Sequence, residues 1–368
     1  MKQKLISFIL FVMALVPICF CSCSSSSKEV AAEYPTVSFS AVADGFPLFG
    51  QGQGATICLS EEDYPVVGIT ARMLADDVER VTGQKPEVAQ VKSLDDVKNA
   101  SVVAGTIGHS AIIDQLISDQ LIQVDEISGK WEASVVTTVK HPATSTPLLV
   151  IAGSDRRGTA FGLTSLSRAI GVSPWYWWAD VTPKHQDALY VQSGRFVQKE
   201  PSVQYRGIFI NDERFGGWAR WVEQHFDKET GKVGPKVYEK VFELLLRLKA
   251  NYLWPAMHPG TQAFNDDPEN ARLADAYAIV MGSSHCEQML RNNEGEWKAV
   301  NEQAVREGRK APLGDFNYIT NRKTMQNYWE TRVKTNGQYE NTYTLGLRGV
   351  HDYPMEGANT TAERVKLM

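Results

Sequence analysis

The sequence is 368 residues long, 43% of them hydrophobic and 22% charged, with a formal net charge of −5. This composition excludes a disordered chain and a chain built mainly of membrane spans, and its length allows about two domains at roughly 150 residues each. No basic stretch indicates a nucleic-acid partner, so we expect none.

The first residues have the layout of a secretory leader. Lys2 and Lys4 precede an apolar run at 5–20, and small residues follow it. The run of about 16 residues is shorter than the roughly 20 needed to span a bilayer. Cys23 follows the small Ser22, as at the lipidation site of bacterial lipoproteins. We therefore expect a lipoprotein signal peptide that ends at Cys23, with this cysteine lipidated and the exported protein anchored to a membrane of the cell envelope.

Cysteines are scarce in the rest of the chain. Beyond the leader only Cys58 and Cys286 remain, far apart in the sequence. Such a pair predicts neither a disulfide framework nor a metal knuckle. Because free cysteines are often buried, we expect two separate buried thiols.

Residues 24–36 are polar and small, which predicts a tether, and residues 37–200 have the pattern of an α/β domain with mixed strands. In one helix Asp63 is the expected cap and Gly83 the expected stop. Ser154 is the expected cap of another helix. The predicted strands cover 55–59, 86–90, 101–106, 133–139 and 148–152, and the predicted helices cover 65–82, 109–118 and 154–170.

Two segments of this domain resemble binding motifs. The stretch 153–159 has the glycine spacing of a phosphate loop, but it lacks the lysine that pairs with phosphate charge, so nucleotide binding is not predicted. The aromatic run 174–178 could be either a plug between domains or a platform for a sugar, because aromatic side chains serve both purposes.

After residue 201 strands alternate with helices, which predicts parallel βα units. The strands are expected at 205–210, 251–255, 278–282 and 343–347, and the helices at 235–250, 270–277 and 323–334. A (β/α)₈ barrel takes about 250 residues, more than this region supplies. We therefore expect residues 201–368 to form the first half of such a barrel, about four βα units, in truncated form.

Chemically capable side chains follow these predicted strands, where a barrel carries its active site. Asp212 and Glu213 are adjacent at one strand end, so their side chains should diverge and at most one should be central. Asp352 comes from another strand end. Two carboxylates on separate strands can face each other across a sugar, as glycosidases require, although each could instead be a solvated loop acid.

Histidine and arginine side chains join these acids. His258, His285 and His351 each lie just beyond a predicted strand. Arg348 has the planar fork that suits bidentate capture of a carboxylate such as that of an acidic sugar, or alternatively an internal salt bridge. His285 and Cys286 are adjacent, and adjacent ligands seldom suit a tetrahedral ion, so no metal site is predicted.

Five segments, in the order in which they occur, resemble glycoside hydrolase family 115: 173–180, 205–213, 251–257, 282–287 and 346–352. The resemblance runs from about residue 40 to the last residue. It implies an enzyme without a cofactor that removes glucuronic or 4-O-methylglucuronic acid linked α-1,2 to xylan, with inversion. The expected partners are glucuronoxylan or its oligosaccharides; the sequence does not predict an oligomeric state.

The resemblance also implies roles for individual residues. It places Asp352 and Asp212 among the catalytic acids and assigns substrate contacts to four others: Asn211, Trp254, His285 and Arg348.

The sequence departs from the family pattern because it ends after the fourth predicted barrel strand. The family's further catalytic glutamate would lie beyond Met368, so we expect no hydrolysis by this chain alone. A non-catalytic glycan-binding envelope lipoprotein is the alternative. The related hexosaminidase architecture is a third possibility, which the spacing of Arg348 and Asp352 disfavours.

Overall fold

The computed structural model describes residues 34–212, 217–258, 260–346 and 348–367. The predicted leader with Cys23, and the predicted acid Glu213, lie outside these ranges. Within them, no helix combines the length and apolar character needed to cross a membrane.

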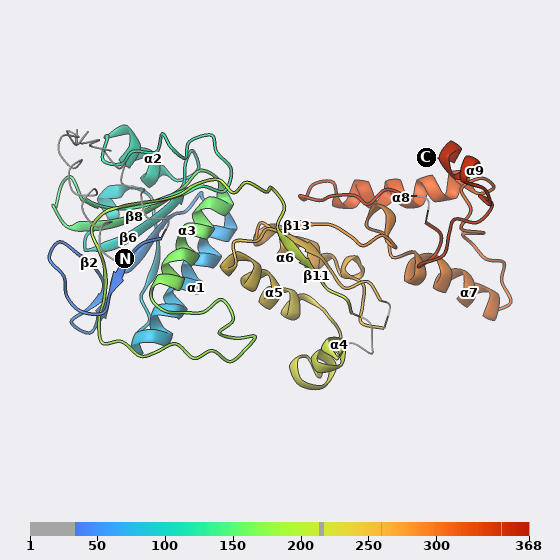
Figure 1. The fold of residues 1–368 in the computed structure, drawn as a ribbon, viewed down its shortest axis with the longest axis horizontal. Coiled ribbons are helices and arrows are strands. Elements are labelled where there is room, and N and C mark those ends of the chain that lie inside the picture. Colours follow the sequence, from blue (N-terminus) through green and yellow to red (C-terminus); the bar gives the residue numbers. More distant parts are fainter. Residues whose placement is uncertain (1–33, 213–216, 259, 347, 368) are drawn as a thin grey trace, which may run out of the picture. The chain divides into compact units, whose positions relative to one another are not determined.

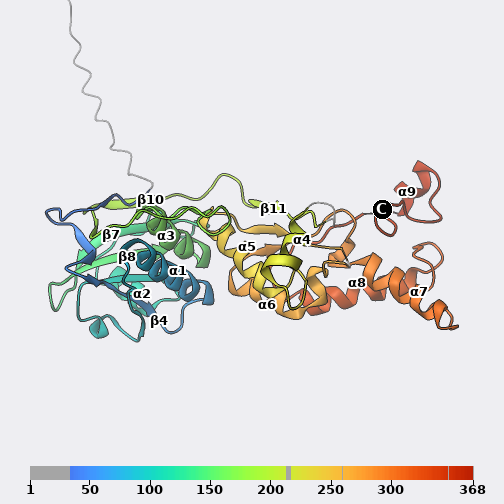
Figure 2. The same cartoon turned by 90° about the horizontal axis from the view of Figure 1, so that it is seen from below.

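A six-stranded sheet organises the first part of the chain (Figures 1 and 2). Its central strands pair in parallel, and β7 and β10 join one side antiparallel. The predicted mixed α/β arrangement is therefore confirmed. In spatial order the strands are β10 (Arg195–Gln198), β7 (Ser134–Lys140), β8 (Pro147–Gly153), β6 (Ser101–Thr106), β4 (Thr56–Ser60) and β5 (Val88–Val91).

Helices cover both faces of this sheet. The helices α1 (Pro65–Thr82) and α3 (Arg156–Ala169) pack together on one face, and α2 (Ala111–Ser118) packs on the other. The alternation of strand side chains produces this sandwich. In β6, for example, Val102 lies in the core under α1 and α3, whereas Val103 lies in the core under α2.

The ends of α1 follow the sequence only in part. Gly83 terminates the helix with φ of 79°, as predicted. The prediction that Asp63 caps it is wrong, because Tyr64 occupies the N-cap position. Asp63 lies one residue too early, and its carboxylate accepts hydrogen bonds from the backbone N–H groups of Tyr64 and Thr106, each at 2.8 Å.

The start of α3 shows a similar shift by one residue. Asp155, not the predicted Ser154, caps the helix by accepting from the Gly158 N–H at 2.7 Å. The Ser154 hydroxyl instead donates to the carbonyl of Ala133, the residue directly before β7. Ser and Asp are both good N-caps, so the sequence alone does not distinguish these two adjacent positions.

A small antiparallel sheet, absent from the sequence prediction, packs beside the large one. Its strands are too short and irregular to show a periodic pattern, yet Phe46, Leu48 and Leu189 join the core under α1 and α3. In spatial order they are β1 (Val37–Ser38), β9 (Leu189–Val191), β2 (Phe46–Gly50) and β3 (Gln53–Gly54).

The second part of the chain contains a parallel sheet in the order β11–β12–β13. Helices lie between its strands along the chain, as the alternation predicted. The described residues form no closed barrel. The elements are β11 (Gly207–Phe209), α4 (Trp218–Trp221), η3 (Val222–Phe226), α5 (Pro235–Arg247), β12 (Tyr252–Trp254), η4 (Phe264–Asp266), α6 (Pro268–Ala276) and β13 (Val280–Met281).

The predicted fourth strand at 343–347 is wrong over 343–346, the part that the structure describes. Only Asn341 forms a parallel bridge, with Met281. Because β13 is two residues long, it offers little edge for pairing, and Thr344 instead accepts from the Met289 N–H and donates its hydroxyl to Ser283.

Most of the remaining helices lie between β13 and residues 343–346 along the chain. Trp297, Phe316 and Met325 form a separate small core there. The elements are η5 (Gln288–Leu290), the π-helical η6 (Asn293–Lys298), α7 (Ala299–Arg306) and α8 (Arg322–Asn336); α9 (Thr361–Leu367) follows.

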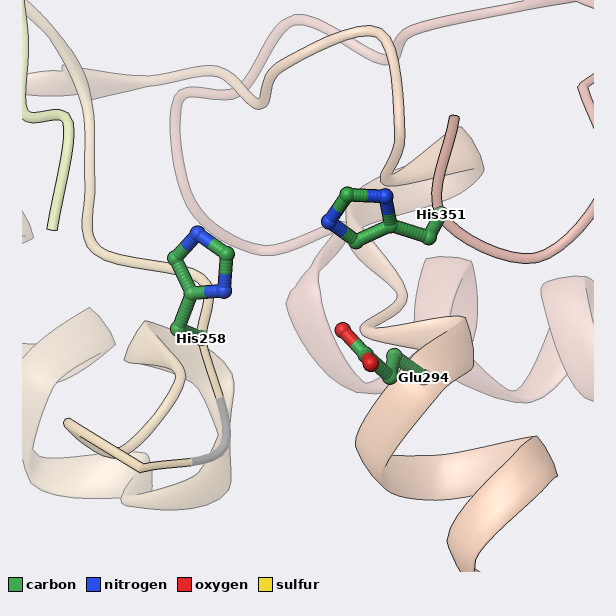
Figure 3. Close-up of side chains that lie close together, drawn as sticks. All are labelled: His258, Glu294 and His351. Carbon is green, nitrogen blue, oxygen red and sulfur yellow. The ribbon is translucent and has the colours of Figure 1, made fainter. Parts of the chain in front are cut away.

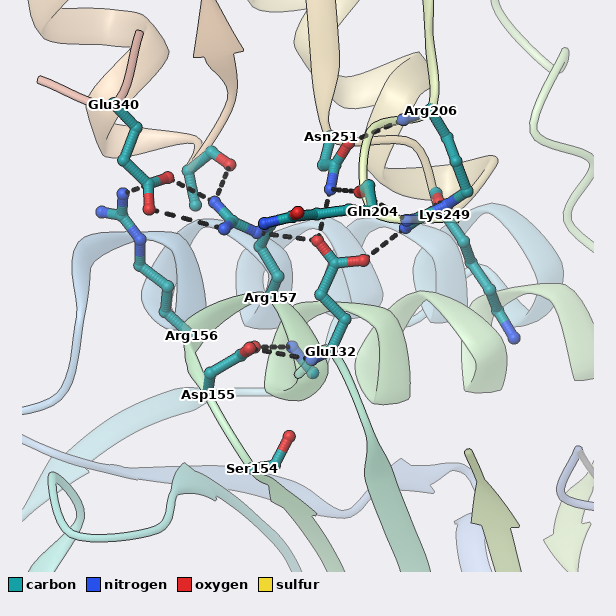
Figure 4. A network of polar contacts seen from close by, with 12 residues as sticks. Glu132, Ser154, Asp155, Arg156, Arg157, Gln204, Arg206, Lys249, Asn251 and Glu340 are labelled. Atoms are coloured by element: carbon teal, nitrogen blue, oxygen red, sulfur yellow. Dashed lines mark hydrogen bonds and ion pairs between the residues drawn. The ribbon is translucent and has the colours of Figure 1, made fainter. Parts of the chain in front are cut away.

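Glu132 links the two sheets through a buried polar network (Figure 4). It precedes β7 and is only 1% exposed. Arg157 Nε of α3 lies 2.9 Å from one of its carboxylate oxygens. Arg206, just before β11, and Asn251, just before β12, donate to the same carboxylate. One buried acid thus fixes the starts of two strands of the parallel sheet.

A second buried network joins α1 to α5. The Arg247 guanidinium donates to both oxygens of Asp77, at 2.6 and 3.0 Å, and both side chains are buried. Arg247 also donates to Glu243, which accepts the hydroxyl of Tyr176 at 2.8 Å. The bidentate geometry compensates the two charges removed from water.

The aromatic run 174–178 contacts α5. Besides the bond from Tyr176 to Glu243, the Trp178 indole donates to the Lys240 carbonyl at 3.2 Å. These contacts favour the plug interpretation for both residues, whereas Trp175 is exposed. One hydrophobic core extends on both sides of residue 200, so the predicted domain boundary there stays a prediction.

Replacing Arg247 by Met should lower the free energy of unfolding by about 3 kcal/mol, because the buried Asp77 would keep only Arg80 as a partner and Glu243 would lose a hydrogen bond. Urea unfolding measures this change. Arg272→Met is the matched control, since Arg272 pairs with Glu269 at the surface and its loss should change stability little. Equal losses in the two variants would contradict the role of the Asp77–Arg247 pair.

Candidate functional site

Asp352 is the centre of a polar cluster that joins two distant segments. One carboxylate oxygen, Oδ1, accepts a hydrogen bond from Arg348, lies 2.8 Å from His285 Nε2 and lies 3.4 Å from the Cys286 sulfur. The other oxygen lies 3.4 Å from His351 Nδ1. The structure therefore brings together three of the predicted site residues, namely His285, Arg348 and Asp352.

The cluster keeps Asp352 ionised. Hydrogen bonding from His285, followed by that from Cys286 and the proximity of His351, lowers the pKa of Asp352 from 3.8 to about 2. The carboxylate remains 58% exposed, so a substrate can reach it. An ionised, accessible carboxylate can accept a proton at neutral pH.

Cys286 adjoins this carboxylate as a thiol. Burial, together with the hydrogen bond to Asp352, raises the pKa of Cys286 to about 11. The thiolate is the form that attacks electrophiles and binds metals, so this cysteine is poorly suited to either role. Cys58 is buried and free as well, so the prediction of two separate buried thiols is confirmed.

Arg348 realises the internal salt bridge that was one of its two predicted roles. Its Nη2 pairs with Asp352. The side chain is still 35% exposed, although its Nε is buried and has no hydrogen-bond partner among the residues whose placement is described. The guanidinium therefore retains donor capacity for a ligand carboxylate.

Asp212 lies in a different environment, with 1% exposure. Its carboxylate accepts from the backbone N–H groups of Met257 at 3.2 Å and His258 at 2.9 Å, and from the Thr261 hydroxyl. By accepting these three hydrogen bonds, Asp212 holds the loop that follows β12 in place. The catalytic assignment of Asp212 stays a prediction, and its contacts favour a positioning role.

The other two predicted contact residues lie at the ends of β11 and β12. Trp254 is half-buried, packs edge-on against Phe209 at 5.6 Å between ring centroids, and donates its indole N–H to Tyr252. Asn211 is exposed directly after β11. Because β11 and β12 are parallel neighbours, both residues lie at the same edge of the sheet.

Two histidines, His258 and His351, lie between the Asp212 loop and the Asp352 cluster. His258, in the loop held by Asp212, lies with its ring centroid 6.0 Å from that of His351, which neighbours Asp352. Glu294 lies beside both rings (Figure 3). The sequence placed the two histidines at strand ends. It did not indicate a role for Glu294, which lies in a long polar stretch without a motif or a periodic pattern.

Glu287 belongs to the family motif at 282–287, but the sequence analysis assigned it no role. Burial, together with the negative charge of Asp212, raises the pKa of Glu287 well above its ordinary value. The segment 283–287 thus places an exposed histidine, a thiol and a buried acid in succession.

A sequence comparison and a structural comparison with known proteins agree on one family. Residues 198–368 match the sequence model of glycosyl hydrolase family 115. A solved family 115 4-O-methyl-α-glucuronidase with specificity for decorated arabinogalactans is similar over 86% of the chain, with 37% identity and a TM-score of 0.73. The chain belongs to glycosyl hydrolase family 115. It spans 38% of the length of that family 115 structure.

Other solved structures are much less similar to this family 115 chain. A family 20 exo-β-N-acetylglucosaminidase from Vibrio harveyi has 9% identity and a TM-score of 0.37, covering 69% of this chain and 35% of its own. A mutant Streptomyces plicatus β-hexosaminidase has 14% identity and a TM-score of 0.39, covering 69% and 44%. These similarities are too weak to assign an activity. A search of curated proteins gives no significant match.

Replacing His285 by Ala should raise the pKa of Asp352 from about 2 toward 3.8, because the largest stabilising hydrogen bond is lost. Since the folded pKa is the lower one, ionised Asp352 stabilises the fold above about pH 4, and this contribution disappears as the pH falls through about 2. A carbon-13 NMR titration of the carboxyl groups measures the change. The exposed His225, replaced by Ala, is the control, and an unaltered Asp352 titration in His285→Ala would contradict the account.

Proposed function

We propose that this chain supplies the uronate-binding part of an α-glucuronidase that acts on α-1,2-linked glucuronic or 4-O-methylglucuronic acid. Family membership supports glycoside hydrolysis as the reaction class, and the similar solved structure is named as a 4-O-methyl-α-glucuronidase. The observation that carries the proposal is the convergence of Arg348, His285 and Asp352 at one accessible point.

The charges of this cluster suit an acidic sugar. A uronic acid presents a planar carboxylate, and the Arg348 side chain, which is 35% exposed, can donate to it from its accessible part. His285 is also exposed and offers a ring nitrogen. A neutral sugar lacks the carboxylate that a charge-assisted hydrogen bond from Arg348 requires, so the site should favour the acidic sugar.

Asp352 has the properties of a general base. An inverting glycosidase needs one carboxylate that activates water and one carboxylic acid that protonates the leaving oxygen. Asp352 is ionised at neutral pH, so of these two roles only that of the base is open to it, and its lowered pKa makes it a weak base. We infer that Asp212, buried beneath three donors, positions the His258 loop rather than protonating the leaving group.

The general acid is therefore missing from the predicted site residues, and we propose that the 368-residue chain does not hydrolyse glycosides by itself. The parallel order β11–β12–β13 and the intervening helices support a (β/α)₈-type barrel as the architecture to which this sheet contributes.

Two polymers fit the proposed substrate class. The family resemblance of the sequence motifs favours glucuronoxylan, whereas the similar solved structure has specificity for decorated arabinogalactans. Both expectations share the terminal 4-O-methylglucuronic acid, which is the part that Arg348 would contact. A non-catalytic glycan-binding protein remains the second candidate, because binding requires only the groups already present.

Calorimetric titration tests recognition of the acid. The chain should bind 4-O-methylglucuronosyl-xylose and not xylobiose, and Arg348→Met should weaken binding about 10–100-fold, the loss expected for a charge-assisted hydrogen bond of about 1.5–3 kcal/mol. Arg309→Met is the control, because Arg309 lies at the surface in a pair with Glu307. Equal affinity for the acidic and neutral sugars would overturn the proposal.

Incubation with methylglucuronoxylan and with decorated arabinogalactan tests catalysis. We expect no release of 4-O-methylglucuronic acid from either polymer, measured by anion-exchange chromatography. Release would refute the inactivity of the chain and would identify the preferred polymer. Binding without release would agree with the proposal and with a glycan-binding role.

We propose further that Cys23 carries a lipid anchor that holds the exported protein at the cell envelope. The supporting pattern is the basic start, the apolar run and the small residue before Cys23. In a bacterial host, Cys23→Ser should abolish incorporation of radiolabelled palmitate, whereas the control Cys21→Ser should retain it. Retention of label in Cys23→Ser would contradict this anchor site.

A further inference from the structure

We propose that His258, Glu294 and His351 bind a divalent transition-metal ion of the zinc class. The two imidazoles and the carboxylate come from three separate segments and converge on one point (Figure 3). Each offers one ligand atom, and these atoms all lie within 4.8 Å of one another. The site neighbours the Asp352 cluster and shares His351 with it, since His351 Nδ1 lies 3.4 Å from Asp352 Oδ2.

The spacing of the ligand atoms leaves room for an ion. At bond lengths of about 2.0–2.2 Å, tetrahedral ligand atoms are about 3.3–3.6 Å apart, so small side-chain rotations would complete the coordination. None of the described residues forms a hydrogen bond or ion pair with the His258 ring or the Glu294 carboxylate. The two side chains thus face a common point without satisfying each other.

The backbone of His258 is fixed before any ion binds. Its N–H donates to Asp212 at 2.9 Å, and its carbonyl accepts from both the N–H and the hydroxyl of Thr261. Asp212 is therefore an outer partner that orients the loop of the first ligand, as partners of metal-binding residues commonly do.

Asn293 holds the other two ligands in register. It directly precedes Glu294 in the π-helical η6, and π-helical turns are frequent at functional sites. Its side-chain oxygen accepts from the His351 N–H at 3.3 Å, and its amide donates to the carbonyls of Cys286 and Gly349. One buried amide thus connects the carboxylate ligand to the second histidine.

The ligand chemistry selects the class of ion. Imidazole nitrogen favours zinc, cobalt, nickel and copper over magnesium and calcium, which prefer oxygen. The neighbouring group of His285, Cys286 and Asp352 is a weaker candidate. Its carboxylate already pairs with the Arg348 cation, and the raised pKa of Cys286 disfavours the thiolate that a metal requires.

Metal binding can be measured without a sugar, so its failure would leave the proposed glucuronidase function untouched. The full chain, purified without a polyhistidine tag and stripped with a chelator, is dialysed against Zn²⁺ at pH 7.5 and its metal content is determined by mass spectrometry. We expect one ion per chain. His258→Ala, Glu294→Gln and His351→Ala should each weaken binding at least tenfold.

Two control variants make the outcome specific. His185→Ala removes an exposed histidine from the segment between α3 and β9 and should leave binding unchanged. Cys286→Ser should also leave it unchanged, and the Co²⁺ complex should show no thiolate charge-transfer band. Circular dichroism verifies that each variant is folded. Absence of stoichiometric binding, binding that survives in folded His258→Ala and His351→Ala, or a thiolate band would each overturn the proposal.

Discussion

The burial of two carboxylates, Glu132 and Asp77, is the constraint on which the arrangement of this chain depends. Each belongs to the α/β part, and each is neutralised by an arginine that lies beside the parallel sheet, Arg206 or Arg247. A buried charge is costly unless it is well paired. Each acid also has an arginine partner within its own part, Arg157 or Arg80, so the second arginine adds pairing that only the docked arrangement provides. The strand starts and α5 are therefore held in place, and with them the strand ends that carry the polar site.

The same distinction between buried and exposed acids organises the site. Asp212 is buried and surrounded by donors, so its carboxylate holds the loop of His258 in place through hydrogen bonds. Asp352 remains exposed, and its neighbours lower its pKa rather than covering it. Two acids at strand ends, which look equivalent in the sequence, thus differ in chemical capacity because of their surroundings.

The sequence predicted the regular elements well where periodicity was strong. The helix α1 and the strands β4, β6 and β8 appeared nearly as expected, because their apolar patterns extend over many residues. Caps were misplaced by one residue, since adjacent polar residues compete for the same role. The strand expected at 343–347 is wrong over 343–346, because an apolar pattern in one segment does not show that the neighbouring strand β13 is only two residues long.

The candidate site was predicted only in part for a related reason. Family motifs located Arg348, His285 and Asp352, which do meet. Arg348 and His285 both contact the same carboxylate oxygen of Asp352. Glu294 lies close to His258 and His351. Both arrangements result from tertiary packing between segments far apart in the chain. Neither could be read from local sequence, because π-helical η6 and the loop at 348–354 have no periodic signature.

The central claim is that Arg348 and its neighbours recognise the carboxylate of a uronic acid. A crystal structure of the chain soaked with 4-O-methylglucuronic acid tests it most directly. The account predicts the sugar carboxylate within hydrogen-bonding distance of the Arg348 guanidinium, with Asp352 facing the anomeric carbon. Binding of the sugar away from Arg348, or with its carboxylate turned toward solvent, would contradict it.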